Sequence, residues 1–126
     1  PDIYGREDYA ALCARIYAHA QSRGIAVECF QSNHEGAIID AIQEADTAFD
    51  GIVINPAAYT HTSVAILDAL KAVAIPAVEV HISAVETRED FRQVSYARLA
   101  CFATITGEGL KGYAHALELL KEHLLH

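Results

Sequence analysis

Methionine and tryptophan are absent from this chain of 126 residues, and basic side chains are scarce. Nine lysines and arginines stand against seventeen acidic residues, so the formal net charge is −8. Nucleic acids and anionic membrane surfaces attract basic faces, and we therefore expect neither as a partner. A small anionic ligand remains compatible with this charge, because a few nearby donors outweigh distant charges that salt screens.

Cysteine is also sparse. Cys13, Cys29 and Cys101 are odd in number and lack the spacing of metal ligands, so we expect reduced thiols in a cytoplasmic protein. No apolar run approaches the length of a transmembrane helix, so no membrane span is predicted. The composition, 52% apolar and 21% charged, is that of a globular protein, and the length suits one domain with a buried core.

Apolar periodicity predicts helices and strands that alternate along the chain. We expect helices at residues 7–23, 37–45, 60–73 and 110–124, a short helix or turn at 87–91, and strands at 25–30, 51–54, 77–80 and 99–105. This alternation calls for a parallel sheet with right-handed crossovers and helices on both faces. The predicted fold class is α/β, a doubly wound three-layer domain over residues 1–126.

The first predicted element is a helix, whereas doubly wound domains normally begin with a strand. If the strand order is the flavodoxin-like 2-1-3-4-5, the strand that is absent is the central one. The chain also begins at Pro1 and has no methionine. We therefore expect the cellular protein to carry roughly fifteen to twenty further residues before Pro1, enough for one strand and a loop.

The strongest site signal is in residues 51–70, GIVINPAAYTHTSVAILDAL. The apolar run before Asn55 is typical of a strand buried on both faces, and Pro56 ends it because proline cannot donate to a ladder. A helix is predicted from Thr60 onward. Ligands of open α/β sheets bind at such carboxyl strand ends, beside helix N-termini. We therefore predict a site at this polar turn, near Asn55 and His61.

Two further strand ends carry histidines, His34 in QSNHE and His81 in EVHIS. Successive carboxyl ends share one edge of a parallel sheet, so His34, His61 and His81 could converge on one crevice. Taken singly, each histidine is more typical of a surface or structural residue than of a catalytic one, and it is their common placement that favours a site. Their spacings do not match those of zinc sites, and no metal is predicted.

Glu79 and His81 alternate along their predicted strand and so share one face. A carboxylate beside a histidine fixes its tautomer and stabilises the imidazolium, which suits a general acid; the alternative is an ordinary pair at a strand edge. Tyr4 is either a surface aromatic or, where cations lower the pKa of its phenol, a base. Arg88 and Arg92 form a solvated helix face unless they point into the crevice.

A series of strings follows along essentially the whole chain: PDIYG, FQSNHEGAIIDAIQEA, GIVINPAAYTHTSVAILDAL, PAVEVHIS, REDFR and GEGLKGY. Their order and spacing resemble those of type II 3-dehydroquinate dehydratase. The resemblance implies a flavodoxin-like fold and the dehydration of 3-dehydroquinate to 3-dehydroshikimate through an enolate, in the shikimate or quinate pathway. It also implies a reaction without metal or cofactor and a homododecamer built of trimers.

The resemblance implies a catalytic role for four residues of this chain. Tyr4 would be the base that removes the C2 proton, with its pKa lowered by an arginine on an upstream loop that the chain lacks. Asn55 would hold the water that stabilises the enolate oxygen. His81 would be the acid that protonates the departing C1 hydroxyl, oriented by Glu79.

The resemblance also implies the groups that bind the substrate. The backbone N–H groups of Ile82 and Ser83 would take the substrate carboxylate. His61 and Arg92 would hold the ring hydroxyls. Asp68 would reach the site from a neighbouring subunit of the trimer.

The chain departs from the family pattern at a few positions. Ala57 and Ala58 stand where the family usually has glycine, Ala84 where it has asparagine, and Glu86 where a second histidine is frequent. Alanine is strained where a loop needs a positive φ, which bears on the efficiency of the reaction. The alternative function is that of a non-catalytic relative that binds a cyclic polyol acid or serves in an assembly. A flavin-binding flavodoxin is disfavoured, because no phosphate loop rich in Ser, Thr and Gly is present.

Overall fold

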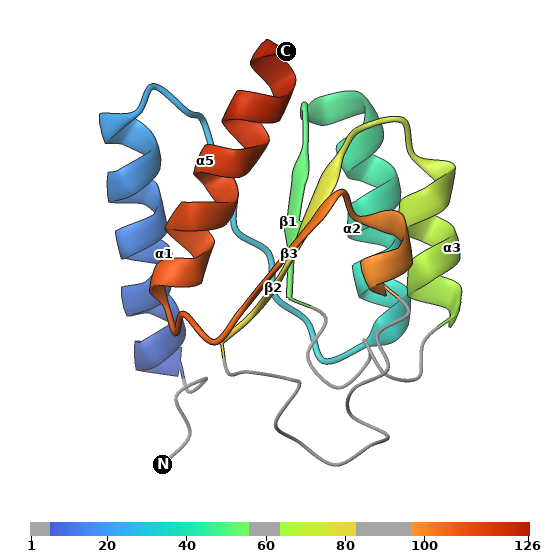
Figure 1. The fold of residues 1–126 in the computed structure, drawn as a ribbon. Helices are drawn as coiled ribbons and strands as arrows, with labels where there is room; N and C mark the ends of the chain where they lie inside the picture. The colour runs from blue at the N-terminus through green and yellow to red at the C-terminus, as the bar shows by residue number, and fades with distance from the viewer. Residues whose placement is uncertain (1–5, 56–63, 83–96) are drawn as a thin grey trace. The chain divides into compact units, whose positions relative to one another are not determined.

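The computed structural model describes residues 6–55, 64–82 and 97–126 (Figure 1). The chain divides after Phe30 into two units, each described here by itself. The first unit holds helix α1 (Arg6–Ser22), close to the helix predicted at 7–23. Gly24 follows at a φ of +71°, with hydrogen bonds from Gly24 N to Gln21 O and from Ile25 N to Ala20 O. This pattern is a Schellman motif, which uses the conformational freedom of glycine to end the helix.

The strand predicted at residues 25–30 is not formed. Its β-branched and aromatic side chains favour an extended chain, but a strand also needs a neighbour to complete its ladder. Among the residues that the structure describes, no strand pairs with this segment. Its backbone instead bonds to a side chain of α1, since Cys29 N donates to Tyr17 Oη at 3.1 Å.

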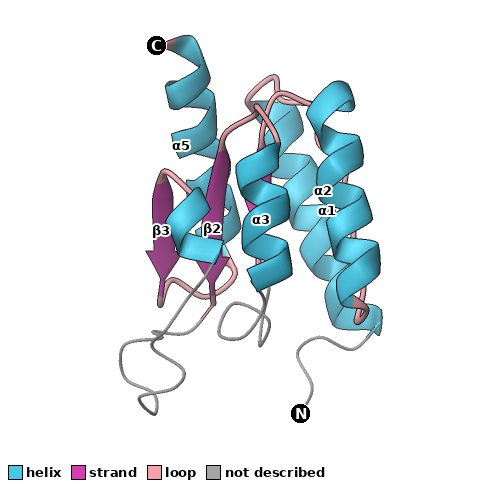
Figure 2. Ribbon diagram, turned by 90° about the vertical axis from the view of Figure 1, so that its right-hand side faces the viewer, coloured by secondary structure: helices cyan, strands magenta, loops and turns pink. Residues whose placement is uncertain are grey.

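The second unit is built on a parallel sheet of three strands, β1 (Ile52–Ile54), β2 (Ala77–His81) and β3 (Ala103–Thr106), in the order β1-β2-β3. Cα partners pair Ile54 with Glu79 and His81 with Thr106. All three strands therefore end at one edge of the sheet, and Figure 2 shows β2 and β3 pointing the same way. The parallel sheet predicted from the alternation of elements is thereby confirmed.

The strand predicted at 99–105 is shorter than expected. The 3-10 helix η3 (Ala97–Ala100) occupies its first part, and Cys101 N donates to Arg98 O at 3.2 Å. The ladder begins only at Phe102, whose N–H donates to Ala77 O at 3.0 Å. Apolar content alone does not separate a strand from a buried 3-10 turn, which is why the prediction was wrong here.

Helices cover both faces of this sheet (Figure 1). Helices α2 (Glu35–Ala48) and α3 (Val64–Ala72) pack on one face, with a core of Ile42, Ile54, Ile66, Ala69, Leu70 and Ala77. Helix α5 (Lys111–Leu125) packs on the other, with a core of Val78, Val80, Ile105, Ala116 and Leu120. Strand β2 is buried along its whole length, as expected of a strand between two helical layers. The predicted three-layer α/β arrangement is confirmed.

Helix α3 turns Ile66 toward the sheet, where it is 1% exposed, whereas Val64 at the start of the helix is 51% exposed. The start of the predicted helix, before residue 64, and the turn predicted at 87–91 lie outside the described residues.

Candidate active site

Polar groups collect where the parallel strands end. Asn55 directly follows β1, His81 is the last residue of β2, and Ile82 follows it. Because Ile54 pairs with Glu79, the register places Asn55 at the level of Val80, one residue before His81. Such a carboxyl edge is where open α/β sheets bind their ligands.

Glu79 and His81 lie together on one face of β2. The histidine Nε2 is 3.2 Å from Glu79 Oε2, and the residues are 7% and 0% exposed. The two groups are within ion-pair distance, although the angles at Nε2 are not those of a hydrogen bond. The alternation of the sequence thus corresponds to a buried carboxylate–imidazole pair, in which a protonated imidazole gains a counter-charge.

The other oxygen of Glu79 faces two residues that the sequence analysis did not identify. Arg98 Nε, on η3, and Thr104 Oγ1, on β3, each lie 3.5 Å from Glu79 Oε1. That distance is at the outer limit for a hydrogen bond, so the charge of Arg98 contributes more than hydrogen bonding does. A fully buried carboxylate needs a cation beside it, and Arg98 supplies one. Thr104 could have been found from strand register, since it pairs with Glu79.

The thiol pKa of Cys101 is affected by the same carboxylate. Burial, and secondarily the negative charge of Glu79, raises the pKa of its thiol to about 12. A thiol with this pKa stays protonated near neutral pH and is therefore a poor nucleophile. All three cysteines are free thiols in the structure.

Asn55 is anchored from the α5 side of the sheet. Its Nδ2 donates to the hydroxyl of Tyr113 at 2.9 Å. Tyr113 stands in the first turn of α5, in the string GEGLKGY, to which the sequence analysis assigned no role. The two residues are 58 positions apart, and nothing in the local sequence pairs them.

The turn between β3 and α5 supports the end of β2. Gly107 N donates to His81 O at 3.3 Å, and Gly109 N donates to Ile82 O at 2.9 Å. Both glycines have positive φ, +74° and +62°, a conformation that strains other residues. This turn therefore fixes the backbone on which His81 and Ile82 are carried.

Comparisons with known proteins agree with this arrangement. A family model described as Dehydroquinase class II matches residues 1–121. The 3-dehydroquinate dehydratase of Ruegeria pomeroyi is 47% identical over 124 residues, which cover 98% of this chain and 83% of that protein. That of Lachnospira eligens is 56% identical over 118 residues, 92% of this chain and 80% of that protein.

The chain belongs to the class II dehydroquinase family.

Solved dehydroquinase structures match the fold as well. The crystal structure of type II dehydroquinase from Butyrivibrio crossotus has a TM-score of 0.89 and 54% identity, covering 94% of this chain and 83% of that one. The type II dehydroquinase of Propionibacterium acnes has a TM-score of 0.86 and 38% identity, covering 93% of this chain and 79% of that one. The resemblance identified from the sequence strings is confirmed, and so is the α/β, flavodoxin-like fold class.

Several residues with roles implied by the dehydroquinase resemblance lie outside the described part of the chain; they are Tyr4, His61, Ser83 and Arg92. Asp68 is described, and it lies exposed on α3 beside the buried Leu67 and Ala69. His34 is an exposed residue at the N-cap of α2, where its side chain makes no capping hydrogen bond.

Residues 6–55, 64–82 and 97–126 contain no group of three or more His, Cys, Asp and Glu side chains that could hold a metal ion. Among the helices of those same segments, none is both long enough and apolar enough to cross a membrane.

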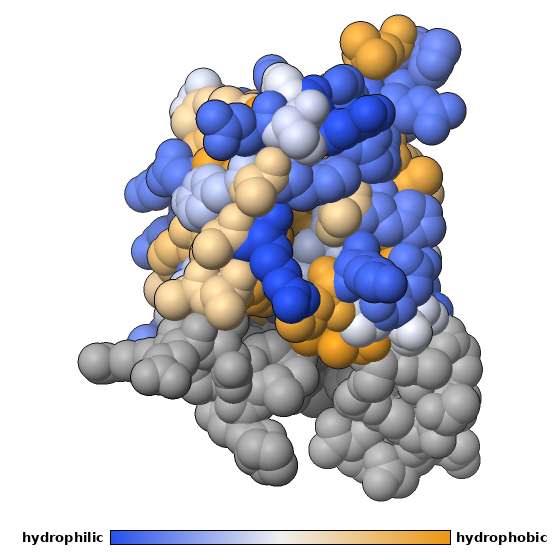
Figure 3. Space-filling model, turned by 90° about the vertical axis from the view of Figure 1, so that its left-hand side faces the viewer, coloured by the Kyte–Doolittle hydropathy of each residue, from blue (hydrophilic) through white to orange (hydrophobic). Residues whose placement is uncertain are grey.

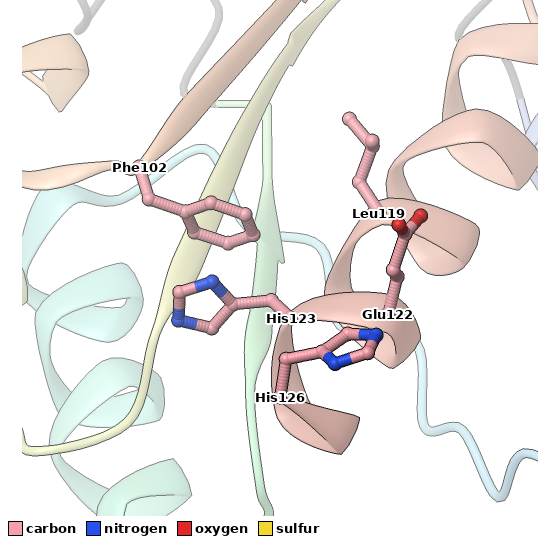
Figure 4. A pocket seen from close by; sticks show the side chains of 5 residues that line it. All are labelled: Phe102, Leu119, Glu122, His123 and His126. Carbon is pink, nitrogen blue, oxygen red and sulfur yellow. The ribbon is translucent and has the colours of Figure 1, made fainter.

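A shallow hollow lies at the other end of the dehydroquinase sheet, where β3 begins (Figure 4). It is lined by Phe102, by Leu119, Glu122 and His123 of α5, and by His126, which follows the helix. The ring of Phe102 stacks on that of His123, with centroids 4.1 Å apart. Because it lies at the amino ends of the strands, this hollow is separate from the carboxyl edge that carries Asn55 and His81.

Proposed function

We propose that the chain is a 3-dehydroquinate dehydratase, a hydro-lyase that converts 3-dehydroquinate to 3-dehydroshikimate on the route to aromatic compounds. Membership of the class II dehydroquinase family supports this proposal. The observation that carries it is the buried pair at the end of β2, where His81 Nε2 lies 3.2 Å from Glu79 Oε2. The alternative, a binding protein without turnover, has no such need for a carboxylate held against a histidine.

The reaction removes water from two neighbouring carbons of the substrate. A base takes a proton from the carbon next to the ketone, and the electron pair of the broken C–H bond forms an enolate. The enolate then expels the C1 hydroxyl, which leaves as water once it has accepted a proton, and a conjugated enone remains. Hydroxide is a poor leaving group, so a positioned acid contributes about 10²–10⁴-fold.

Asn55, Glu79 and His81 account for the two difficult steps. Protonated His81 donates to the departing hydroxyl, and ionised Glu79 holds the imidazole in position. Asn55 holds a water that donates a hydrogen bond to the enolate oxygen, and one such preorganised donor contributes about 10²–10³ in rate. No metal or organic cofactor takes part in this scheme.

The other roles rest on the resemblance alone. Tyr4 is the base in this scheme, and Ile82 and Ser83 supply backbone donors to the substrate carboxylate. His61 and Arg92 hold the ring hydroxyls.

The proposal extends to the assembly and its location. Asp68 is a carboxylate exposed on α3, where it is available to complete the site of a neighbouring copy. We place the chain in a homododecamer built of trimers, in the cytoplasm. Three free cysteines support an environment that keeps thiols reduced.

The proposal is tested by the absorbance of the enone formed from 3-dehydroquinate. Wild-type protein should form product, and His81→Ala should lower kcat by about 10²–10⁴-fold with little change in KM, because the acid acts mainly in the transition state. His126→Ala, which removes an exposed imidazole from the last residue of the chain, is the matched control and should retain turnover. Near wild-type kcat in His81→Ala would disprove the assignment of the acid. Wild-type protein that binds 3-dehydroquinate in calorimetry but forms no enone would favour the non-catalytic alternative.

A further inference from the structure

Glu79 lies between two groups that can carry positive charge. Its Oε2 is 3.2 Å from His81 Nε2, and its Oε1 is 3.5 Å from Arg98 Nε. The carboxylate is fully buried, whereas the side chains of His81 and Arg98 are 8% and 38% exposed. The charge of Arg98 is permanent, because a guanidinium stays protonated in proteins. The charge of His81 comes and goes, because the proposed reaction transfers its proton to the substrate.

A buried carboxylate and a neighbouring imidazolium can exist in two arrangements. They can remain an ion pair, or one proton can pass from the imidazolium to the carboxylate and leave two neutral groups. Burial favours the neutral arrangement, because both members of an ion pair must be removed from water. The two arrangements hold the same number of protons, so a change of pH alone does not convert one into the other.

Only the ion pair suits a general acid. In the neutral arrangement the proton is bound to Glu79, whose side chain is 0% exposed and is therefore shielded from a ligand at the edge. His81 then carries a neutral imidazole, which is a far weaker acid than an imidazolium and does not protonate a departing hydroxyl effectively. The proposed reaction therefore needs a group that opposes transfer of the proton from His81 to Glu79.

Arg98 lies where such a group is needed. It belongs to η3, and its Nε is beside Oε1 of Glu79, the oxygen that does not face His81. A positive charge there stabilises the ionised carboxylate and has little effect on a protonated one. Two other side chains near Glu79 do not supply this charge. The hydroxyl of Thr104 is neutral, and the thiol of Cys101 stays neutral because its pKa is raised to about 12.

We propose that Arg98 is a positioning residue for the dehydration: its permanent charge beside Glu79 holds the imidazole of His81 in the protonated form that donates to the leaving group. This role rests on the proposed function and adds a residue to it. Arg98 acts through Glu79 and needs no contact with the substrate. After His81 has given up its proton, Arg98 still provides a counter-charge for the buried carboxylate.

The first test is infrared spectroscopy of Arg98→Met, which keeps an unbranched side chain and removes the charge. A protonated carboxyl group has a C=O stretch that is well separated from the bands of ionised carboxylates. At neutral pH this band should be absent from wild-type protein and present in Arg98→Met, and adding Glu79→Gln should remove it again. Arg15→Met removes an exposed arginine of α1 and is the matched control, which should show no such band. A wild-type band that Glu79→Gln abolishes, or no band in Arg98→Met, would overturn the proposal.

Turnover of 3-dehydroquinate supplies the second test. Arg98→Met should lower kcat by about 10-fold, which is the smaller of the effects that an arginine commonly has on a neighbouring carboxylate, because Arg98 is partly exposed. KM should change little, since the acid acts mainly in the transition state. Arg98→Lys should restore most of the lost kcat, because a contact of 3.5 Å acts more through charge than through hydrogen-bond geometry. A rise in KM alone, or no recovery with lysine, would contradict a role through the charge of Glu79.

The pH dependence of kcat separates this role from a purely structural one. A positive charge beside the Glu79–His81 pair disfavours a proton on either member, so removal of the charge lets the pair keep its proton to higher pH. The alkaline limb of the kcat profile should therefore lie at higher pH in Arg98→Met than in wild type, although the maximum is lower. A lower maximum with the limb in its wild-type place would show that Arg98 only supports the fold.

Failure of the proposed function gives a different result. If wild-type protein forms no enone, the dehydratase assignment fails, and the role of Arg98 in the reaction fails with it. If wild-type protein turns over and only the Arg98 variants depart from expectation, the proposed function stands without Arg98. Should Arg98→Met not fold, Arg98→Gln takes its place, because it keeps a polar group beside Glu79 and still removes the charge. Wild-type kcat in Arg98→Gln would then overturn the proposal.

Discussion

Glu79 is the buried carboxylate of the proposed site at the carboxyl edge of the sheet. Its side chain is fully buried, and its two oxygens face different partners: Oε2 faces His81, and Oε1 faces Arg98 and Thr104. Burial penalises an ionised carboxylate, and cations nearby favour it. Arg98 therefore has a role distinct from that of His81, since its charge is permanent and favours the ionised form of Glu79 whether or not the histidine is protonated.

The charge of Glu79 can be measured through Cys101. Because the carboxylate is one cause of the raised thiol pKa of about 12, Glu79→Gln should lower the pKa of Cys101. The value should stay above the ordinary 9.0, because burial is the larger cause and is retained. The pH dependence of alkylation by iodoacetamide, in a background with Cys13 and Cys29 replaced by serine, measures this pKa.

The same thiol makes stability depend on pH. The folded state keeps its proton up to about pH 12, whereas an unfolded thiol loses it near its ordinary pKa of 9.0. The contribution of the protonated Cys101 thiol to the stability of the folded state is fully present below pH 9 and is lost as the pH rises toward 12. Glu122→Gln, at an exposed position of α5, is the control and should leave the thiol titration unchanged. An unchanged titration in Glu79→Gln would mean that Glu79 is not ionised in the wild-type protein.

Single site residues could be predicted from the sequence where the residues that define the site lie close together in one helix or strand. Glu79 and His81 are two positions apart on one strand, and Pro56 marks the strand end that exposes Asn55. Arg98 and Tyr113 were missed because their contacts join residues 19 and 58 positions apart, through the order of the strands and the docking of α5. The string GEGLKGY was noted in the sequence, but its partner becomes visible only in the fold.

At the level of elements, helices were easier to predict than strands. Helices α1, α2 and α5 close their hydrogen bonds within themselves, so apolar periodicity locates them to within a few residues. Residues 25–30 have the side chains of a strand but no described partner, and η3 replaces the first part of the predicted last strand. A strand depends on a neighbour elsewhere in the chain, and local sequence does not specify that neighbour.

The docking of α5 on the sheet makes a testable contrast between two helical glycines. An added Cβ at Gly36 of α2 meets nothing within 4 Å, so Gly36→Ala should raise the free energy of unfolding by about 0.5–1 kcal/mol through helix propensity. Gly112→Ala should instead lower it by about 1 kcal/mol, because Val80 and Ile105 lie within 3.4 Å and are buried in the sheet.

Urea unfolding measures both changes. Equal stabilisation by both substitutions would show that α5 accommodates the added methyl group without cost. That result would contradict the close packing of α5 against the sheet.

On the scale of the molecule, the candidate site is assembled from both faces of the sheet. Asn55 bonds to a residue of α5, whereas Glu79 and His81 lie on the face covered by α3 and η3. Side chains on opposite faces of the sheet come together at its carboxyl edge. The substrate is therefore expected to lie over that edge and not between the sheet and the helices on either face. Apolar surface is found elsewhere too, and Figure 3 shows apolar side chains projecting among hydrophilic ones at the end of α5, where Leu124 and Leu125 are 47% and 73% exposed.

The proposed assembly predicts that Asp68 of one copy serves the site of another. Asp68→Ala and His81→Ala should each be nearly inactive alone, the first through weak substrate binding and the second through loss of the acid. When the two variants are unfolded together and refolded, some sites combine His81 from one chain with Asp68 from its neighbour. Random mixing should restore roughly a quarter of wild-type activity, because each such site needs one particular ordered pair of copies.

Light scattering supplies the control for this experiment. Wild-type protein and the mixture should both have a mass near twelve times that of one subunit. Oligomers of wild-type subunits mixed with His81→Ala subunits should lose activity in proportion to the His81→Ala content. Mixed oligomers of the expected mass with no restored activity would show that Asp68 acts within its own subunit or not at all. A mass equal to one chain at working concentration would contradict the assembly itself, because no neighbouring copy would then be present to contribute Asp68.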